Sequence, residues 1–427
     1  MPEHWDVERL KSVFSLVTRS PREEDEIVTA FRDGTVTLRK NRREDGFTNA
    51  FHEHGYQRIE KGDLIIHAMD AFAGAIGVSD SEGKSTPVYS VCVPRSVEHN
   101  PRYFGYLLRS MAMSGYVTAL AKGIRERSTE FRWKEAANVV LSVPPCNEQD
   151  SIVATLDRET AKIDELVAEQ QRLMELLKEK RQAVISHAVT KGLNPDAPMK
   201  PSGVEWLGEV PAHWIVGPLK FLVDPDGGIQ MGPFGGMLLD LRSDDTGYKV
   251  FGQENTISGD FSLGARWIDS QRYTSLQSYW LESGDIVLTR KGSLGNARLV
   301  GELPSPGIID SDTIRVRVDH SRLRRDYLAV LFHEAEYVKH QITQAQRGAI
   351  LPGVNSTTIS NIVLALPPMP EQAEIMESLV RGAAMFEEQI GSVQRAVELL
   401  VERRTSIISA AVTGQIDVRH LAPEAAA

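Results

Sequence analysis

The sequence predicts an α+β protein with a pseudo-two-fold internal duplication. Two similar globular parts are joined by two long helices, which we expect to form an antiparallel coiled coil. Two observations predict this class: the second half of the chain repeats the first, and each copy ends in a long stretch with a seven-residue apolar repeat. The length of 427 residues is itself typical of two or three domains.

The repeat is clearest where each long helix is expected to begin. The stretch Val-Leu-Ser-Val-Pro-Pro-Cys-Asn-Glu-Gln at 140–149 is echoed 223 positions later by Val-Leu-Ala-Leu-Pro-Pro-Met-Pro-Glu-Gln at 363–372. The same offset continues without a gap as far as 185–190 and 408–413. A second echo, offset by 209 positions, relates residues 2–11 to residues 211–220. The chain therefore contains two copies of one unit, each a globular segment followed by a helix.

The two offsets also predict the order of the parts along the chain. We expect a first globular domain at 1–143, a first coiled-coil helix at 144–190, a linker at 191–212, a second globular domain at 213–366, a second coiled-coil helix at 367–413 and a C-terminal tail at 414–427.

Each long helix has apolar residues at strict seven-residue spacing, which is typical of a coiled-coil seam. Both copies run from globular domain to helix. If the two copies are related by the pseudo-two-fold, helices that pair within the chain are therefore antiparallel. Two alternatives stay open: each helix joins a separate oligomer, or each is an ordinary amphipathic helix on a domain surface. The predicted seam residues are Leu156, Ile163, Leu177 and Val184 in the first helix, and Leu379, Phe386, Val393, Leu400 and Ile407 in the second.

The two globular parts show the same order of predicted elements. In each, a short apolar run after a glycine indicates a buried strand, and a further strand and a helix follow. The strands are expected at 63–66 and 88–93 in the first part and at 285–288 and 313–318 in the second, and the helices at 101–108 and 325–332.

Catalytic motifs are missing from the sequence, so we predict no catalytic residue, no metal site and no cofactor bound by this chain. The run Gly83-Lys-Ser85 lacks a glycine at the spacing of a phosphate-binding loop, and a strand is expected after it where that loop needs a helix. Neither a nucleophile elbow nor a zinc-protease motif is found. Two cysteines suit a reducing compartment, and no apolar run is long enough to span a membrane. We therefore expect a cytoplasmic protein.

Loops rich in basic and amide side chains are the remaining candidates for function. Arg and Lys suit phosphates and guanine edges, and Gln and Asn suit adenine edges. Each cluster alone is typical of a solvated surface, but similar loops on two equivalent domains favour binding. The candidate DNA-binding residues are Arg39, Lys40, Arg42, Arg43, Lys122, Arg125, Arg127 and Arg132 in the first domain, and Gln230, Lys249, Gln253, Asn255, Arg290, Lys291, Ser293 and Arg347 in the second.

At this point the residues resemble a known family, the DNA-specificity subunits of type I restriction-modification systems. The resemblance rests on the Pro-Pro-x-x-Glu-Gln boxes at 144–149 and 367–372, and on the central stretch Pro-Ser-Gly-Val-Glu-Trp-Leu-Gly-Glu-Val-Pro-Ala-His-Trp at 201–214. Further similar segments are Ile229–Gly236, Gly284–Ile286 and Gly292–Gly295. The resemblance covers essentially the whole chain.

The resemblance implies a role in bacterial defence. Each globular part would be a target recognition domain that reads one half of a bipartite site in double-stranded DNA, and the coiled coil would set the spacer between the halves. Two modification subunits, which are adenine methyltransferases using S-adenosylmethionine, and two restriction subunits, which are translocase-nucleases using ATP and Mg, would dock on this scaffold. The chain itself would be non-catalytic.

Other functions stay open from the residues alone. The main alternative is a duplicated coiled-coil adaptor whose heads bind proteins and not DNA, and another is an enzyme with an unrecognised site. The formal net charge of -10 at first counts against a DNA-binding protein, because such proteins usually present a basic surface. However, residues 1–143 contain 20 basic and 20 acidic side chains, so basic loops on a nearly neutral head are compatible with weak DNA binding that partners reinforce.

Overall fold

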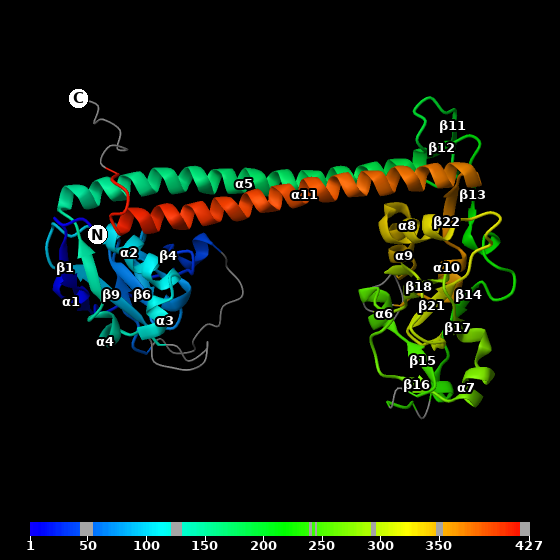
Figure 1. Ribbon diagram of the computed structural model, residues 1–427, viewed down its shortest axis with the longest axis horizontal. Coiled ribbons are helices and arrows are strands. Elements are labelled where there is room, and N and C mark those ends of the chain that lie inside the picture. Colours follow the sequence, from blue (N-terminus) through cyan, green and yellow to red (C-terminus); the bar gives the residue numbers. More distant parts are fainter. Residues whose placement is uncertain are drawn as a thin grey trace. The chain divides into compact units, whose positions relative to one another are not determined.

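The computed structural model (Figure 1) describes residues 1–42, 54–120, 130–238, 241–243, 246–291, 296–346 and 353–418. The chain divides into two compact units, and each contains one globular head together with parts of both long helices. Unit 1 consists of Met1–Arg172 and Val393–Ala427, and unit 2 consists of Leu173–Ser392.

Unit 1 is built on a four-stranded antiparallel sheet with strand order β2-β9-β6-β7. Helix α2 (Pro101–Met113) packs against β6 and β7 of this sheet. Its N-cap is Asn100, whose side chain accepts a hydrogen bond from the Arg102 backbone, and Pro101 supplies a preset helical φ at the first position. The strands of the head are β1 (Asp6–Arg9), β2 (Phe14–Val17), β3 (Val28–Ala30), β4 (Val36–Leu38), β5 (Gln57–Ile59), β6 (Leu64–His67), β7 (Ile76–Val78), β8 (Gly83–Ser85), β9 (Tyr89–Pro94) and β10 (Val140–Val143).

Unit 2 repeats this plan with the sheet β14-β21-β18-β19, and adds a second four-stranded sheet, β16-β15-β20-β17. The added sheet contains a parallel pair, β15 with β20. The strands of the first sheet are β14 (Ile229–Met231), β18 (Ile286–Thr289), β19 (Ala297–Leu299) and β21 (Thr313–Val316), and those of the second are β15 (Tyr248–Phe251), β16 (Trp267–Ile268), β17 (Trp280–Leu281) and β20 (Gly307–Ile309).

Shorter elements complete both heads. The helices of unit 1 are α1 (Leu10–Val13), η1 (Arg39–Asn41), η2 (Ala71–Ala73), α3 (Tyr116–Leu120) and α4 (Trp133–Ala136). Those of unit 2 are η3 (Leu219–Phe221), η4 (Gly235–Leu238), α6 (Gln253–Ser258), α7 (Ser270–Ser275), η5 (Gln277–Tyr279), α8 (Arg325–Glu334), α9 (Glu336–Gln346) and α10 (Ser356–Ser360). The remaining strands of unit 2 are β11 (Met199–Pro201), β12 (Glu209–Pro211), β13 (Ile215–Pro218) and β22 (Val363–Leu366).

The strands predicted from the apolar runs are confirmed as β6, β9, β18 and β21, and the two head helices as α2 and α8. The Gly83-Lys-Ser85 run itself forms strand β8, and the strand expected after it is β9. The predicted linker folds as the antiparallel hairpin β11–β12, and its Leu207 and Val210 are buried in the core of unit 2. No helix among the described residues is both long and apolar enough to cross a membrane.

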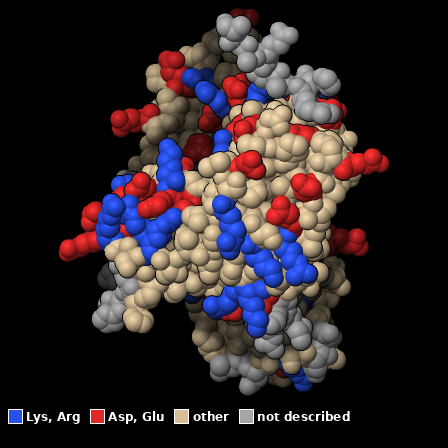
Figure 2. All heavy atoms as spheres, turned by 90° about the vertical axis from the view of Figure 1, so that its left-hand side faces the viewer, with Lys and Arg blue, Asp and Glu red and all other residues tan. Residues whose placement is uncertain are grey.

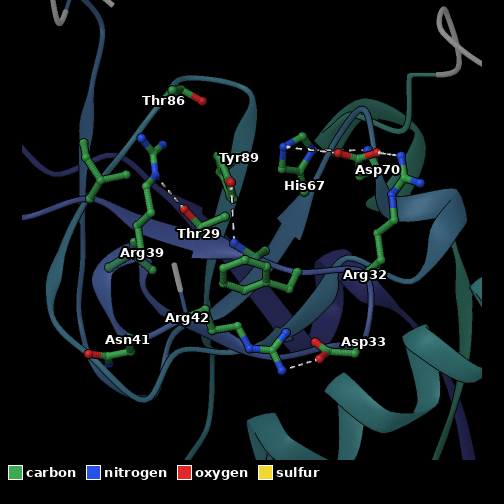
Figure 3. Close-up of a pocket in the computed structure, with 14 residues that line it drawn as sticks. Thr29, Arg32, Asp33, Arg39, Asn41, Arg42, His67, Asp70, Thr86 and Tyr89 are labelled. Carbon is green, nitrogen blue, oxygen red and sulfur yellow. Dashed lines mark hydrogen bonds and ion pairs between the residues drawn. The ribbon is translucent and has the colours of Figure 1, made fainter. Parts of the chain in front are cut away.

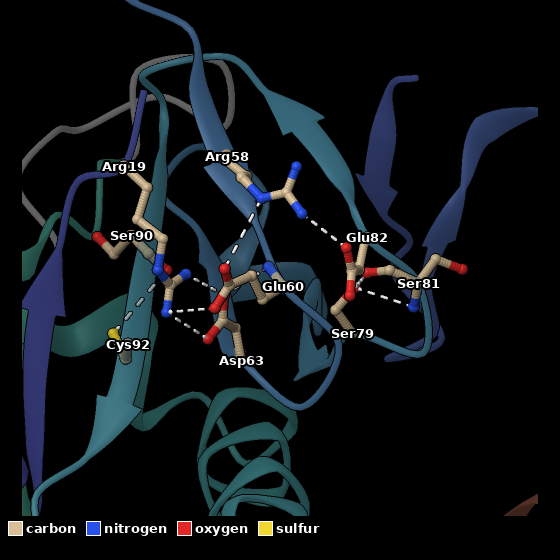
Figure 4. Close-up of polar contacts among 9 residues, drawn as sticks. All are labelled: Arg19, Arg58, Glu60, Asp63, Ser79, Ser81, Glu82, Ser90 and Cys92. Carbon is tan, nitrogen blue, oxygen red and sulfur yellow. Dashed lines mark hydrogen bonds and ion pairs between the residues drawn. The ribbon is translucent and has the colours of Figure 1, made fainter. Parts of the chain in front are cut away.

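A paired glycine and aspartate begin the central strand of each head. Gly62 and Gly284 have φ values of 97° and 94°, which glycine adopts without the steric cost of a Cβ. The next residue, Asp63, accepts hydrogen bonds from Arg19 at 2.5 and 3.1 Å (Figure 4), and its counterpart Asp285 accepts from Arg317 at 2.8 and 2.9 Å. Each head therefore binds an arginine at this aspartate, although Arg19 follows β2 and Arg317 follows β21, which are not equivalent strands.

The two long helices are α5 (Cys146–Lys191) and α11 (Met369–Val412). Within each unit, their segments run antiparallel and side by side (Figure 1). In unit 1 the first turns of α5 and the last turns of α11 share one hydrophobic core, and in unit 2 the last turns of α5 and the first turns of α11 do so. In unit 1 the pair is also joined by an ion pair between Arg404 and Asp164 at 2.8 Å. The predicted antiparallel coiled coil is confirmed.

The predicted seam needs one correction. Leu156, Ile163, Leu379, Phe386 and Val393 are buried, and Leu177, Leu400 and Ile407 are half-buried. Val184, however, is 43% exposed, and the next residue Ile185 is buried in its place. An ideal helix has 3.6 residues per turn, so its face drifts by about 20° per heptad, and after four heptads from Leu156 the neighbouring residue faces the core. The second helix shows the same shift, with Ile408 buried beside half-buried Ile407.

The Pro-Pro-x-x-Glu-Gln boxes join each helix to its head. Glu148 Oε2 lies 2.8 Å from His4 Nε2, and in the second copy Glu371 Oε2 lies 2.7 Å from His213 Nε2. The following Gln149 is buried and donates its side-chain N–H to the Pro144 carbonyl. Buried polar groups are costly unless they are paired, so the box is a set of satisfied contacts at the start of the helix.

Candidate nucleic-acid interface

The head of unit 1 contains a concave site of about 1050 Å³ lined by residues of β3, η1, β6 and β9 and the segments between them (Figure 3). Its polar lining residues include Thr29, Arg32, Arg39, Arg42, His67 and Tyr89. The site therefore brings two of the predicted DNA-binding arginines, Arg39 and Arg42, together with groups from three other parts of the head.

The basic segment from Arg39 to Arg42 follows β4 and is held by specific contacts. Arg39 Nε donates to Thr29 Oγ1 at 3.4 Å. Lys40, which lies outside the lining, forms an exposed ion pair with Glu26. Arg42 pairs with Asp33 at 2.6 Å, and its guanidinium lies 4.9 Å from the centre of the Phe31 ring. These contacts orient the arginines toward the concavity, where they can bind an anionic or hydrogen-bonding ligand.

The pairing with Arg42 favours the anionic form of Asp33. Burial by itself raises the pKa of its carboxyl, but hydrogen bonds from the Thr35 backbone and from Arg42 outweigh burial, and the pKa lies below its ordinary value. The charge of Arg42 is therefore partly balanced. Ion pairs between exposed side chains are weak, so a phosphate can compete for this arginine.

The opposite side of the concavity is formed by His67, Asp70 and Tyr89 (Figure 3). Burial lowers the pKa of His67, with the Asp70 carboxylate opposing that effect. Burial also raises the pKa of Tyr89 to about 12. At neutral pH the pocket therefore offers an uncharged imidazole and an uncharged phenol, and its positive charge comes from arginine alone. Sequence reasoning missed these two residues, because an isolated His or Tyr near a strand end carries no motif.

The second predicted basic stretch of this head is only partly described. Arg132 is exposed and pairs with Glu130 at 2.8 Å, and the neighbouring Phe131 donates its backbone N–H to the carbonyl of Ala68, next to His67. Four predicted residues, Arg43, Lys122, Arg125 and Arg127, lie outside the described residues. On the face of unit 1 shown in Figure 2, basic side chains gather in groups, although the head as a whole is nearly neutral.

In the head of unit 2, three of the predicted residues are exposed or half-buried. Arg290 follows β18 and donates to the Ser311 carbonyl at 3.2 Å, and its guanidinium lies 4.9 Å from the Phe234 ring centre. Lys291 forms a partly exposed ion pair with Asp312 at 2.7 Å. The half-buried Gln230, on β14, donates to its neighbouring carbonyl at Met231.

Phe234 is a candidate that the sequence analysis passed over. It is 47% exposed in the Gly-Pro-Phe-Gly-Gly run that follows β14. An aromatic ring held beside an arginine can stack on or pack against a base. The signal in the sequence is a single aromatic residue inside a glycine-rich run.

Two predicted residues of this head are corrected because they are buried. Lys249, on the central strand β15, is 3% exposed and donates to the Ser262 carbonyl. Asn255 is 1% exposed; its Oδ1 accepts from the Gly252 backbone, and its Nδ2 donates to the carbonyls of Asp260 and Leu263. Both side chains stabilise the fold around α6 and are not available to DNA.

The remaining candidates give less information. Gln253 is half-buried at the first position of α6, and Ser293 and Arg347 lie outside the described residues. The described part of the chain contains no group of three or more His, Cys, Asp or Glu side chains that could hold a metal ion. The geometry of both heads thus supports binding by arginine and aromatic side chains.

These features define a class of protein, a duplicated α+β chain with two potential binding heads on an antiparallel helix pair. No protein-family model matches the chain. It is 24% identical to the type I restriction enzyme StySPI specificity subunit of Salmonella potsdam, and 22% identical to the EcoKI specificity subunit of Escherichia coli (strain K12). Each alignment covers 97% of this chain and 90% of the relative.

Two solved structures have the same fold. One is a chain from a structure of a type I R-M system that addresses its complex assembly and conformational transition, with a TM-score of 0.70. The other is the HsdS subunit from Thermoanaerobacter tengcongensis, with a TM-score of 0.55. Both are 16% identical to this chain, and the matches cover 97% of it and 99% and 98% of theirs. Together the comparisons confirm the predicted resemblance to type I restriction specificity subunits.

Proposed function

We propose that the chain is the DNA-specificity subunit of a type I restriction-modification complex, and that each head reads one half of a bipartite target in double-stranded DNA. The observation that carries this proposal is similarity to specificity subunits over 97% of the chain, in a fold with two equivalent heads. The arginine-lined concavity of unit 1 and the Arg290–Phe234 pair of unit 2 provide suitable contacts.

In this function the chain is a non-catalytic cytoplasmic scaffold. It assembles with two adenine-methylating modification subunits, which bind S-adenosylmethionine, and two restriction subunits, which use ATP and Mg for translocation and cleavage. The antiparallel helices α5 and α11 set the spacer between the half-sites. The adaptor alternative, with protein-binding heads and no role on DNA, is less well supported, because full-length relatives are named as specificity subunits.

The direct test is to co-produce the chain with its modification subunit and to map methylated adenines on random-sequence DNA. We expect methylation within one asymmetric motif made of two short half-sites and an unspecified spacer. Methylation without a bipartite motif, or none at all with an intact methyltransferase, would overturn the proposal.

A variant of the same experiment tests the spacer. Deleting one heptad from both α5 and α11 keeps the seam in register, since seven residues complete two turns of a coiled coil. We expect a changed spacer, or no methylation, with the half-sites unaltered whenever methylation persists. The control is the chain with both helices intact and the head substitution Arg42→Ala. This variant should keep the wild-type spacer.

A further inference from the structure

A second concavity in unit 1 is lined by three arginines. It measures about 210 Å³ and lies where α2 and α11 meet the segment around Gly34 and Gly77. The arginines are Arg102, Arg109 and Arg404. This concavity adjoins the larger one described above, because Asp33 lines both.

Two of the three arginines already have carboxylate partners. Arg102 pairs with Asp157 at 2.6 Å, and Arg404 pairs with Asp164 at 2.8 Å. Arg109 differs, because it makes no hydrogen bond or ion pair with any described residue, and its Nε is buried without a partner. An arginine side chain stays charged in proteins, so Arg109 is a cation that no described carboxylate contacts directly, and the carboxylates of Asp33 and Asp164 act on it only from farther away.

The backbone around Arg109 is shaped to accommodate its side chain. Gly34 has a φ of 90°, and a Cβ at this position would lie 2.6 Å from Arg109 Cδ. A Cβ at Gly74 would meet the Nε at 3.5 Å. Burial, together with the positive charge of Arg404, lowers the pKa of Arg109, and the carboxylates of Asp33 and Asp164 oppose this effect without cancelling it. The guanidinium is thus held in a partly dry setting beside a second cation, an arrangement that costs free energy unless an anion is bound.

The internal duplication allows the contacts of Arg404 to be compared with those of its counterpart in the other copy. Arg404 corresponds to Arg181, by the offset of 223. In unit 2, Arg181 pairs at 2.8 Å with Glu334, which lies on the head helix α8. Tyr103 of α2 matches Tyr327 of α8, so the residues equivalent to Glu334 and His333 are Ser110 and Arg109. Unit 2 thus supplies this arginine's anion from its head, whereas in unit 1 the anion comes from Asp164 of α5 and the head presents a serine and an additional cation, Arg109.

We infer that Arg109 binds a phosphate group of the DNA backbone next to the half-site that the larger concavity of unit 1 contacts. This inference rests on the proposed function. DNA phosphate is the fitting anion because the site adjoins Arg39 and Arg42 through Asp33, and because a guanidinium can form paired hydrogen bonds to phosphate oxygens. The contact positions the duplex and carries no base specificity.

The test measures how DNA affinity depends on salt for the full chain assembled with its modification subunits. Arg109→Met keeps the aliphatic packing over Gly34 and removes the charge, and Arg109→Lys keeps the charge. Losing one phosphate contact should reduce the slope of log affinity against log salt by about 0.9. When the salt is raised from 50 to 200 mM, the factor by which DNA affinity falls should therefore be about threefold larger for the wild type than for Arg109→Met. Target and scrambled duplexes should show the same change in slope, and Arg109→Lys should restore it.

A matched control removes an exposed cation elsewhere: Arg381→Met acts on α11 in unit 2, where the arginine pairs with Glu377 on the surface, and its slope should equal that of the wild type. The thermal midpoint of Arg109→Met should not fall, because the variant loses a half-buried charge that has no hydrogen bond or ion pair with a described residue. If wild type and Arg109→Met share one slope while the wild type selects its bipartite target, the inference fails and the proposed function stands. Weaker assembly with the modification subunit at an unchanged slope would likewise overturn it, and would assign the anion to a protein carboxylate. If the wild type shows no preference for any bipartite target, the proposed function itself fails.

Discussion

The side-chain oxygen of Gln149 accepts a hydrogen bond of 2.8 Å from the backbone N–H of Asn100. Asn100 caps α2, so this contact joins the first turn of a long helix to the first turn of the head helix. The second copy repeats it, since Gln372 accepts from the Arg324 backbone at 2.8 Å and donates to the Pro367 carbonyl. The glutamine of each box therefore bonds to two segments that the sequence alone does not bring together.

Replacing Gln149 or Gln372 by leucine should destabilise the protein by about 1–3 kcal/mol, because a buried backbone N–H and a buried carbonyl lose their partner. The free energy of unfolding in urea, followed by circular dichroism, measures the effect. Gln170→Leu, at a half-buried seam position of α5, is the control and should be neutral or stabilising. Equal stability of the Gln149 variant and this control would show that the box contacts are dispensable.

The loss of stability caused by substitutions along the coiled coil should depend on the burial of each side chain and not on its place in a strict heptad. Phe386 is 3% exposed, so Phe386→Ala should cost about 3–5 kcal/mol through lost burial and the cavity left behind. Val184→Ala should change stability by no more than about 0.5 kcal/mol, since this side chain faces solvent. Urea unfolding of the two variants decides the point, and a large loss in Val184→Ala would contradict the corrected seam.

Two lysines of the second head should behave in opposite ways. Lys249→Met should lower the free energy of unfolding without altering the recognised sequence, because the buried ammonium bonds to the Ser262 carbonyl. Lys291→Ala should leave stability within about 0.5 kcal/mol and weaken DNA binding, with a salt slope lowered by about one. Unfolding and binding curves for both variants test this. A selective loss of DNA affinity in Lys249→Met would restore that residue as a contact.

The stability of unit 1 should fall in mild acid because of His67. Its folded-state pKa lies below the ordinary value of 6.5, so the unfolded chain takes up the proton more readily. The contribution of His67 to the free energy of unfolding is present above about pH 6.5 and is lost as the pH falls through the lower folded-state pKa. We expect the free energy of unfolding to decrease between pH 6.5 and 5, and His67→Gln to flatten that decrease. An identical pH profile in the variant would rule out this residue as the source.

Much of the architecture was predictable because it depends on local pattern and on the repeat. The offsets of 223 and 209 located both helices and both heads, and the glycine before each apolar run located β6 and β18. The candidate site was predicted less well. Arg39 and Arg42 do line one concavity, but His67 and Tyr89 reach it from strands separated in sequence. Lys249 resembles a surface lysine in sequence, but it lies on β15, between β16 and β20 of the added sheet of unit 2, where it is buried and donates to the Ser262 carbonyl.

The sequence by itself determined the duplication, the fold class and the order of the elements, since periodicity and repetition are properties of neighbouring residues. Tertiary structure decided which side chains have partners. Arg109 and Arg404 lie 295 positions apart in the chain and line the same concavity. Arg404 pairs with Asp164 of α5, whereas its counterpart Arg181 pairs with Glu334 of the head helix α8. Charge compensation depends on distances across the fold, and a linear pattern does not contain those distances.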